Sequence, residues 1–346
     1  MDYPKFKVCV KCLTFNHSKY IIDAMNGFTM QQTDFPFVCC IVDDASTDGE
    51  QDIIRKYLED NFDFSAGSTG YWKEADYGHI AYAQHKTNKN CHFAVILLKE
   101  NLYSKKQGYK KAGYIAEWRD SCEYDALCEG DDYWIVPDKL QKQVEVLDSN
   151  PEYSMCVTDA VIQSEKGELN WTRYDQDRIV PINDIIVYGG SWLQTATFVY
   201  RNRIRSGMIE CGVQSHTGDY PLMIWCAMKG NVYFLAEKTA VYRYGYGWTK
   251  SFKKVNIEKK IIAYRSEINM LKGFDEYSNF KYHKSFIRRR KIYMTQILKG
   301  DKSHMGLLKN AFREEYCLFS LLEKSDFVFY KLGLSIVPRI RRKLVR

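Results

Sequence analysis

The chain has 346 residues, of which 45% are hydrophobic and 15% aromatic, so a disordered protein is excluded and a large folded domain with an additional region is expected. No early apolar run has the features of a signal peptide, and no stretch of about 18 apolar residues could span a bilayer, so we expect a cytoplasmic protein. The net charge of +7 is modest, and its clearest concentration is in residues 327–346, which contain six Lys or Arg and no acid.

Strands and helices are predicted to alternate over the first 150 residues. Ser18 is expected to cap the first helix, Pro137 lies at the first turn of the last one, and Asn150 ends it. The eleven cysteines, several of them inside these strands, are expected to be reduced thiols that act as small buried hydrophobic residues. The alternation predicts an α/β fold, a largely parallel sheet with helices on both faces. The predicted strands are residues 7–13, 37–42, 93–98 and 124–128, and the predicted helices are residues 18–28, 49–62, 105–120 and 137–149.

Residues 61–92 interrupt this alternation. The segment is polar, rich in Gly, Tyr and His, and too long for an ordinary connection between two elements. We therefore expect a substrate-facing excursion or a mobile lid. The spacings of its three histidines, His79, His85 and His92, match no standard helical metal pair, so no metal is expected there.

The composition changes after residue 150. Runs of β-branched and aromatic residues predict strands at residues 153–158, 195–200 and 232–244. From residue 251 the apolar residues follow a helical spacing, and another helical stretch covers about residues 304–324. The sequence thus predicts an α/β domain over residues 1–250 and a helical C-terminal region over residues 251–346.

Two of the predicted strands end in acidic residues. Asp43 and Asp44 follow one strand, and Glu129, Asp131 and Asp132 follow another. Crowded carboxylates repel one another unless a divalent cation lies between them, commonly one that also binds phosphate oxygens. A metal site that receives a phosphorylated substrate is therefore the first hypothesis, and a solvated acidic turn is the alternative.

A third polar cluster, Thr14-Phe15-Asn16-His17, follows the first predicted strand. Ligands of parallel sheets bind at the carboxyl ends of the strands. The three polar clusters are therefore expected to converge on one crevice. Asn16 and His17 are equally explained as helix caps.

Four motifs, in this order, resemble those of the inverting family 2 glycosyltransferases, which have the Rossmann-like GT-A fold. The similarity extends over about residues 8–246 and is greatest to bacterial members that assemble capsule, lipopolysaccharide or exopolysaccharide units. It implies a nucleotide-binding half over about residues 1–150 and an acceptor half over about residues 151–250. The motifs are FNHSKYI from Phe15, VDDASTDG from Val42, EGDDYW from Glu129 followed by KLQKQV, and HTGDYPL from His216.

The resemblance implies a nucleoside-diphosphate sugar as donor and Mn²⁺ or Mg²⁺ as cofactor. Asp131 and Asp132 occupy the family's metal and ribose positions. We expect Asp132 to bind the metal, and Asp131 to contact the ribose and sugar and to share in the metal site. The family's first acidic position is Glu129 here rather than Asp, so it stays open which of these carboxylates touches the metal directly.

Asp43 and Asp44 match the family positions that recognise the base and ribose of the nucleotide. Thr14, Phe15 and Asn16 belong to the same nucleotide-binding set, with Thr14 and Phe15 contacting the base. A carboxylate that accepts the ring N–H of uracil favours a UDP-hexose or a UDP-N-acetylhexosamine as donor.

Asp219 matches the family's catalytic base, a carboxylate that takes the proton from the acceptor hydroxyl as the new bond forms. On local pattern alone the same residue is explained as a helix N-cap. Arg243 lies in the aromatic, glycine-containing segment 242–248 and is expected to contact phosphate. The Gln-x-x-Arg-Trp signature of the processive family members is absent from the sequence, which favours single sugar additions.

The basic residues of the segment 327–346 are interleaved with Leu, Ile, Val and Phe. This pattern fits an anionic bilayer surface at the inner face of the cell membrane better than a nucleic acid, and it suggests a lipid-linked saccharide acceptor. The alternative is a terminal helix that packs on the protein.

Two other functions stay open. A metal-dependent sugar-nucleotide nucleotidyltransferase would be expected to carry a Gly-rich basic loop where this chain has Thr14 to His17. A catalytically silent binding module with the same fold is the other alternative.

Overall fold

The computed structural model describes residues 3–169, 173–190, 192–245, 255–301 and 303–331. The chain forms two compact units. The first contains Met1–Pro181, Ser191–Gly207 and Trp225–Lys250, and the second contains Ile182–Gly190, Met208–Ile224 and Ser251–Arg346. The domain boundary at residue 250 remains a prediction.

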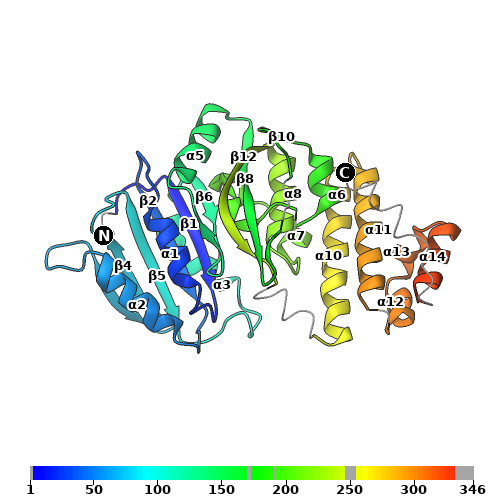
Figure 1. Ribbon diagram of the computed structural model, residues 1–346, viewed down its shortest axis with the longest axis horizontal. Coiled ribbons are helices and arrows are strands. Elements are labelled where there is room, and N and C mark those ends of the chain that lie inside the picture. The colour runs from blue at the N-terminus through cyan, green and yellow to red at the C-terminus, as the bar shows by residue number, and fades with distance from the viewer. Residues whose placement is uncertain (1–2, 170–172, 191, 246–254, 302, 332–346) are drawn as a thin grey trace. The chain divides into compact units, whose positions relative to one another are not determined.

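The first unit is built on a mixed sheet of twelve strands, counted over the described residues. Its strand order is β10-β12-β8-β11-β6-β1-β2-β5-β4-β3, with β7 paired to β12 and β9 paired to β8. The central strands β6, β1, β2 and β5, labelled in Figure 1, are parallel. Antiparallel pairs are added on either side, by β11 next to β6 and by β4 and β3 beyond β5. The central strands are β1 (Val8–Thr14), β2 (Phe37–Asp43), β5 (Cys91–Leu98) and β6 (Tyr124–Leu127).

Both faces of this sheet are covered, because the central strands are apolar on both sides. One face packs against α1 (Ile21–Thr29), α2 (Glu50–Asn61) and α5 (Lys139–Ser149). The other face packs against the segment that contains α3 (Lys110–Tyr114) and α4 (Ala116–Arg119). Side chains that alternate along a strand point to opposite faces, so the continuous apolar runs supply both cores. The predicted α/β fold, with a parallel central sheet and C-terminal helices, is confirmed.

Residues 61–92, predicted to form a substrate-facing excursion or a mobile lid, contribute two strands to the sheet instead. The segment folds into β3 (Tyr71–Ala75) and β4 (Gly78–Gln84), an antiparallel hairpin that extends the sheet beyond β5. Alternate residues of β4 enter the two cores, with Ile80 and Tyr82 on one side. Gly78 has no room for a side chain, because a Cβ there would lie 2.1 Å from the carbonyl oxygen of Leu97.

Two details of the predicted helices are also wrong. Ser18 caps no helix: α1 follows Tyr20, and the backbone N–H of Ser18 donates to Asp48 instead. The helix predicted over residues 105–120 is reduced to the short α3 and α4, because Lys106 has a φ angle of 58° and Ile115, between the two helices, has φ −101° and ψ 1°, both outside helical geometry.

The remaining strands of the first unit are longer or shorter than predicted. The β8–β12 pair is parallel and contains register shifts, and 3-10 turns replace part of the strand predicted at residues 195–200. The elements are β7 (Tyr133–Trp134), β8 (Tyr153–Ser164), β9 (Gly167–Leu169), β10 (Arg178–Val180), η1 (Thr195–Thr197), β11 (Val199–Arg201), η2 (Asn202–Ile204) and β12 (Asn231–Arg243).

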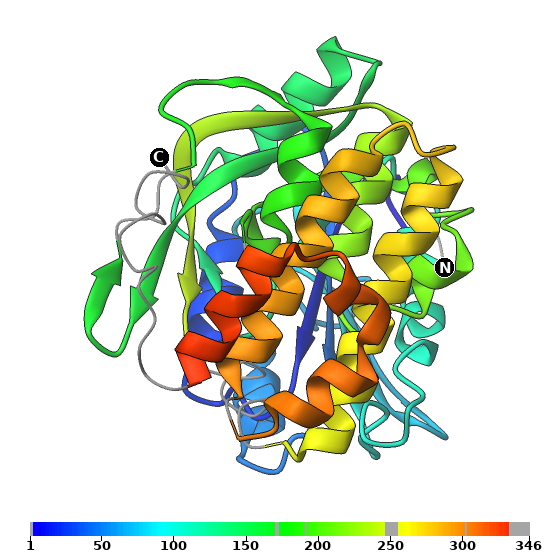
Figure 2. The same ribbon diagram turned by 90° about the vertical axis from the view of Figure 1, so that its right-hand side faces the viewer.

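The second unit is helical over its described residues. Helices α10 and α11 run alongside each other, in yellow and orange in Figure 2. Met294, Leu298 and Leu308 lie in its apolar core, which a buried Arg290–Glu315 ion pair borders with two hydrogen bonds of 2.8 and 2.7 Å. The helices are α6 (Ile182–Tyr188), α7 (Glu210–Val213), the first residues of α8 (Asp219–Lys229), α10 (Ile257–Tyr277), α11 (His283–Gly300), α12 (Met305–Ala311), α13 (Arg313–Cys317) and α14 (Leu321–Lys331).

Among the described residues, no helix is both long enough and apolar enough to cross a membrane. The basic tail predicted from Phe327 begins inside α14, where Phe327 is buried and its ring lies 5.1 Å from that of Phe319. Phe327 therefore packs on the helical unit, as the alternative to membrane binding predicted for this residue. Residues 332–346, which hold most of the basic side chains, lie outside the described residues.

Candidate active site

The polar loops that follow β6, β1 and β2 meet at one edge of the sheet, because these strands are parallel neighbours. Gly130, in the loop after β6, lies so close to the loop after β1 that a Cβ on it would be 2.2 Å from the Oγ1 of Thr14. The Nε2 of His17 lies 3.8 Å from the Oδ2 of Asp131. The convergence predicted for the three polar clusters is thus observed within the first unit.

Asp43 is fully buried at the end of β2, and only one of its carboxylate oxygens is satisfied. Oδ1 accepts the backbone N–H of Ser46 at 3.0 Å and the side-chain amide of Gln51 at 2.5 Å. Oδ2 is buried and has no hydrogen-bond partner among the described residues. A buried carboxylate oxygen without a donor is costly, so this atom is suited to accept a hydrogen bond from a ligand.

Asp44 is also buried, but its two oxygens are bound by the protein itself. Oδ1 accepts the backbone N–H of Leu102 at 2.8 Å, and Oδ2 accepts that of Tyr103 at 3.1 Å. The Nζ of Lys111 pairs with Oδ2 at 2.7 Å. Asp44 therefore fastens the loop after β5 to the end of β2.

Glu50 connects the loop after β1 with the loop after β2. The sequence did not indicate this role. Its buried carboxylate accepts the hydroxyl of Thr14, the backbone N–H of His17 at 2.8 Å and the hydroxyl of Ser46 at 2.8 Å. Burial raises the pKa of this carboxyl above its ordinary value. The only sequence signal for Glu50 is its place in the first turn of a helix, directly after an acidic motif.

The first two loops are also joined through Asn16. Its backbone N–H donates to the hydroxyl of Ser46 at 2.8 Å, and its Oδ1 accepts the backbone N–H of Thr47 at 2.8 Å. Asn16 and Ala45 both have positive φ angles, 56° and 62°, which residues with side chains seldom adopt. Such strained conformations persist where the surrounding contacts demand them and concentrate at functional sites. Phe15, between Thr14 and Asn16, is 41% exposed, so its ring is accessible to a ligand.

Asp131 and Asp132 form the acidic turn after β6. Asp132 is buried and accepts the backbone N–H of Arg243 at 2.9 Å, whereas Asp131 is partly exposed. Burial, and next the charge of Asp131, raises the pKa of Asp132 well above its ordinary value. Two adjacent carboxylates that repel each other fit a divalent cation, since Mn²⁺ and Mg²⁺ prefer oxygen ligands. No group of three or more His, Cys, Asp or Glu side chains within the described ranges is arranged to hold a metal.

Arg243 braces the acidic turn from β12. Its guanidinium donates to the carbonyl oxygen of Asp131 at 2.6 Å and to the carboxylate of Asp23 at 2.5 Å. It also lies 4.7 Å from the ring centre of Tyr20 and 4.5 Å from that of Tyr133. The predicted phosphate contact of Arg243 stays a prediction, and residues 246–248 of the same segment lie outside the described residues.

Asp219, the predicted base, lies in the second unit at the first position of α8. Its Oδ1 accepts the backbone N–H of the next residue, Tyr220, at 2.8 Å. Burial raises the pKa of the carboxyl to about 6. A carboxylate with a pKa near neutrality is a stronger base than an ordinary Asp and stays largely ionised at pH 7.

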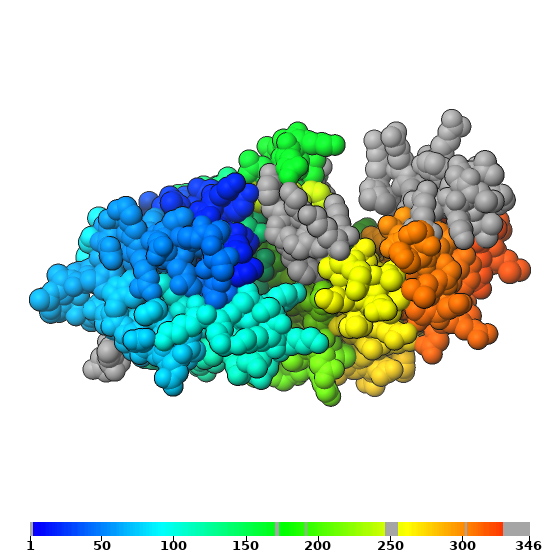
Figure 3. Space-filling view, turned by 90° about the horizontal axis from the view of Figure 1, so that it is seen from below, coloured from blue at the N-terminus to red at the C-terminus, as the bar shows by residue number. Residues whose placement is uncertain are grey.

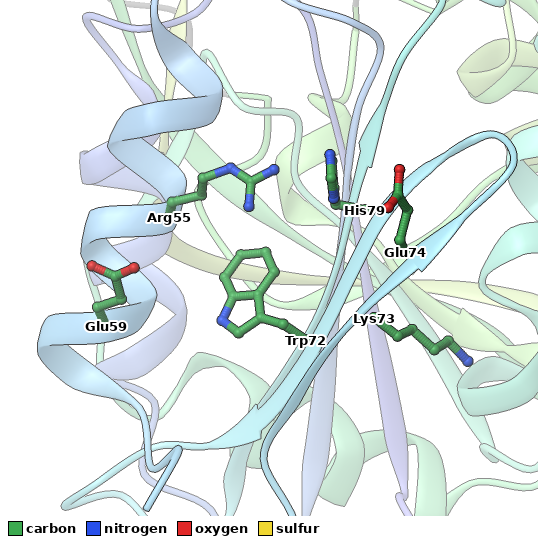
Figure 4. A pocket seen from close by; sticks show the side chains of 6 residues that line it. All are labelled: Arg55, Glu59, Trp72, Lys73, Glu74 and His79. Atoms are coloured by element: carbon green, nitrogen blue, oxygen red, sulfur yellow. The ribbon is translucent and has the colours of Figure 1, made fainter.

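A shallow pocket of about 290 Å³ lies elsewhere in the first unit, between α2 and the β3–β4 hairpin (Figure 4). The guanidinium of Arg55 lies 4.9 Å from the ring centre of Trp72, and the ring of Phe64 stacks on Trp72 at 6.0 Å. Because Arg55 and Phe64 both lie against it, the indole is already engaged in protein contacts. The pocket is lined by Arg55, Glu59, Trp72, Lys73, Glu74 and His79.

Comparison with known proteins gives distant relatives. No family model matches the chain. The uncharacterized proteins Rv1520 of Mycobacterium tuberculosis and Mb1547 of Mycobacterium bovis are each 31% identical over 244 residues, which cover 67% of this chain and 57% of theirs. The chain thus spans little more than half the length of these curated relatives.

Two solved structures are similar to this chain. S. aureus TarS (residues 1–349), in complex with UDP-GlcNAc, matches with a TM-score of 0.53 at 15% sequence identity. The match covers 95% of the present chain and 92% of the TarS chain. The mannosyltransferase PcManGT from Pyrobaculum calidifontis, in complex with GDP-Man and Mn²⁺, matches with a TM-score of 0.51 at 11% sequence identity. This match covers 99% of the present chain and 85% of the PcManGT chain. At these identities the likeness shows a shared fold.

Proposed function

We propose that the chain is an inverting family 2 glycosyltransferase that transfers a sugar from a nucleoside diphosphate to a hydroxyl of a saccharide acceptor. The observation that carries this proposal is the unsatisfied buried Oδ2 of Asp43, at the sheet edge where the acidic turn and the loop of Thr14 also lie. The binding of UDP-GlcNAc by TarS and of GDP-Man by PcManGT, proteins with the same fold, supports it.

The donor is a UDP-hexose or a UDP-N-acetylhexosamine. Oδ2 of Asp43 accepts a hydrogen bond from the ring N–H of uracil. This hydrogen bond is strong because a carboxylate oxygen carries negative charge. Phe15 offers its exposed ring to the base, and Thr14 and Asn16 shape the loop that receives it. Asp44 contributes by holding the loop at Leu102 and Tyr103 in place.

Mn²⁺ or Mg²⁺ would be held at the acidic turn by Asp131 and Asp132. When bound, the cation neutralises the charge that grows on the departing diphosphate. The Mn²⁺ in the PcManGT complex supports this assignment. Arg243 keeps the turn in shape through the carbonyl of Asp131 and the carboxylate of Asp132, and Asp131 also faces the donor ribose and sugar.

Asp219 is the base in this reaction. The bond from the anomeric carbon to the diphosphate oxygen breaks, a bond from the same carbon to the acceptor oxygen forms, and the hydroxyl proton passes to the Asp219 carboxylate. Because one displacement from the opposite face suffices, the anomeric configuration inverts and the enzyme needs no covalent intermediate. The raised pKa of Asp219 supports the role.

The acceptor is a lipid-linked saccharide of a surface polysaccharide such as capsule or lipopolysaccharide. The basic and apolar residues of the segment 332–346 bring the protein to the anionic inner face of the cell membrane, as a peripheral protein. Since Phe327 is part of a packed core, a truncation that tests this step removes residues 332–346 only. The truncated chain is expected to leave vesicles that contain anionic lipid.

A binding screen tests the proposed function. The purified chain is titrated with UDP, GDP, UDP-GlcNAc, UDP-glucose and GDP-mannose, with Mn²⁺ or with EDTA, while its melting temperature is followed. One nucleotide is expected to raise the melting temperature with Mn²⁺ and to lose most of this effect in EDTA. A chain that binds none of them in the presence of metal contradicts the proposal, and NMR of the glycoside formed tests inversion.

A further inference from the structure

The loop that precedes Asp219 is fastened to α10, a helix beyond the region that resembles family 2 glycosyltransferases. Glu267 lies on α10, is 7% exposed, and uses one carboxylate oxygen for three hydrogen bonds. Its Oε1 accepts the hydroxyl of Ser215 at 2.8 Å, the backbone N–H of Thr217 at 3.0 Å and the hydroxyl of Thr217 at 3.0 Å. The next residue along the loop is Gly218, followed by Asp219.

Neighbouring contacts fix the same loop along α10. The hydroxyl of Ser266 donates to the carbonyl oxygen of Gln214 at 3.0 Å. Two turns further along the helix, Gly273 lies so near Cys211 that a Cβ on it would be 2.2 Å from the sulfur. Residues 211–217 are therefore held at several points by a single 21-residue helix, α10, seen in yellow in Figure 3 beside the orange residues of the helices that follow it.

A second helix of the same unit supports the other side of Asp219. The backbone of Gly190 lies against Asp219, since a Cβ on Gly190 would be 3.3 Å from its Oδ2. The preceding residue, Gly189, has a φ angle of 79°, and a Cβ there would lie 2.4 Å from the guanidinium of Arg289 on α11. Arg289 is nine-tenths buried, donates to the carbonyl oxygen of Tyr188 at 3.4 Å and lies over the ring of Tyr220.

We infer that Glu267 is a positioning residue for the catalytic base: it holds the loop at Ser215 and Thr217 so that the carboxylate of Asp219 keeps the orientation that proton transfer needs. This inference rests on the function proposed above, in which Asp219 is the base. It also gives the helical C-terminal region a part in the reaction, through a residue that touches no substrate.

The chemistry of the three hydrogen bonds explains why a carboxylate is used. Three donors converge on one oxygen, and an ionised oxygen accepts such bonds more strongly than an amide does. A misplacement of about 1 Å at a reacting group costs on the order of 100-fold in rate, so a loop that carries a base gains from a rigid anchor.

Two variants of Glu267 test the inference. Glu267→Leu removes the acceptor oxygen, whereas Glu267→Gln keeps an oxygen at nearly the same place without the charge. Glu276→Gln is the matched control, because Glu276 is an exposed acid on the same helix. Thr217→Val removes one donor from the loop side and keeps Glu267, which leaves a usable variant if Glu267→Leu fails to fold.

Two measurements are made on each variant. Hydrogen–deuterium exchange of the backbone N–H of Thr217 is expected to be at least tenfold faster in Glu267→Leu than in the wild-type chain, with an intermediate rate in Glu267→Gln. The turnover number is expected to fall roughly 10- to 100-fold in Glu267→Leu while the KM for the donor stays constant. Glu267→Gln is expected to recover part of the turnover, and Glu276→Gln should match the wild-type chain in both measurements.

The outcomes separate this inference from the proposed function. Unchanged exchange at Thr217 overturns the anchoring role, and faster exchange with wild-type turnover overturns the role in catalysis. A rise in the donor KM equal to the loss in kcat/KM also contradicts a pure positioning role. If the wild-type chain transfers no sugar, the proposed function fails, and the exchange rates alone then decide whether Glu267 holds the loop.

Discussion

Asp44 and Asp43, neighbours at the end of one strand, contrast in how the protein satisfies them. Asp44 receives two backbone N–H groups and the ammonium of Lys111, and Glu50 nearby is bound in a similar way by Thr14, His17 and Ser46. Asp43 keeps one buried oxygen that no described residue hydrogen-bonds. Buried acidic residues at this sheet edge thus differ: Asp44 and Glu50 are bound by the protein on both oxygens, whereas Oδ2 of Asp43 is available to accept a hydrogen bond.

The second unit repeats this contrast with different residues. Glu267 is the holding carboxylate there, with three donors on one oxygen. Among the described residues, the hydrogen bond that Asp219 accepts from another residue comes from the backbone N–H of Tyr220, and burial raises the pKa of Asp219 to about 6. We therefore expect the number of protein donors on a carboxylate to indicate its task better than its burial does. Substitutions of the loop-holding carboxylates should lower stability, whereas substitutions of the carboxylates with fewer donors should lower ligand binding or rate.

The largest effect is expected at Asp219. Asp219→Asn keeps the size and the bond from Tyr220 but cannot take a proton, so the transfer rate should fall about 10³-fold with unchanged donor affinity. Nucleoside diphosphate release and donor titration measure the two quantities. Glu258→Gln, a change of an exposed acid at the start of α10, serves as the control. Wild-type turnover in Asp219→Asn would show that the base is another group.

Asp44 should act on stability instead. Asp44→Ala leaves the mostly buried Lys111 without its partner and frees two backbone N–H groups, so the free energy of unfolding should fall by about 3–5 kcal/mol. Urea denaturation followed by circular dichroism measures this change. A stable Asp44→Ala chain that has lost only nucleotide binding would mean that Asp44 contacts the ligand directly.

Asp43 should show the opposite behaviour. Asp43→Asn can still accept the N–H groups of Ser46 and Gln51 but lacks the charged second oxygen, so UDP affinity should weaken roughly 10- to 100-fold at nearly constant stability. Isothermal titration in the presence of Mn²⁺ measures the affinity, with the exposed Asp52→Asn as control. Equal affinity in Asp43→Asn and the wild-type chain would remove Asp43 from the binding site.

The smallest effect concerns pH. The base acts in its ionised form, and with a pKa of about 6 the Asp219 carboxyl is roughly 90% ionised at pH 7 and roughly 10% at pH 5. The value of kcat/KM should therefore fall about tenfold per pH unit below pH 6 and level off above pH 7. A profile that stays flat down to pH 5 would contradict the raised pKa or the role of Asp219.

Much of this fold could be predicted because its central strands are short, apolar runs between helices of clear periodicity. The hairpin of β3 and β4 was missed for a physical reason: β3 is partly exposed, and the two strands are stabilised by pairing, β3 with β4 and β4 with β5, rather than by a pattern of their own. The single helix predicted over residues 105–120 is interrupted at Lys106 and Ile115, whose backbone angles are not helical and which no apolar spacing revealed.

The candidate site was predictable in its residue types but not in its internal connections. Strand ends located Asp43, Asp44, Asp131 and Asp132 at one sheet edge, as parallel strands require. The tasks of Glu50 and Glu267 depend on contacts across 36 and about 50 residues of chain, which no local pattern encodes. The same limit applies to Arg243, which reaches Asp23 across 220 residues.

The two ends of the strand order carry a consequence for solubility. β3 lies at one end and presents the exposed charges of Lys73 and Glu74, and β10 lies at the other end with three residues that include the exposed Arg178. Charged or very short outer strands are poor templates for a strand from another molecule. A wide sheet rich in Val, Ile and Phe is in this way protected from lengthening into aggregates.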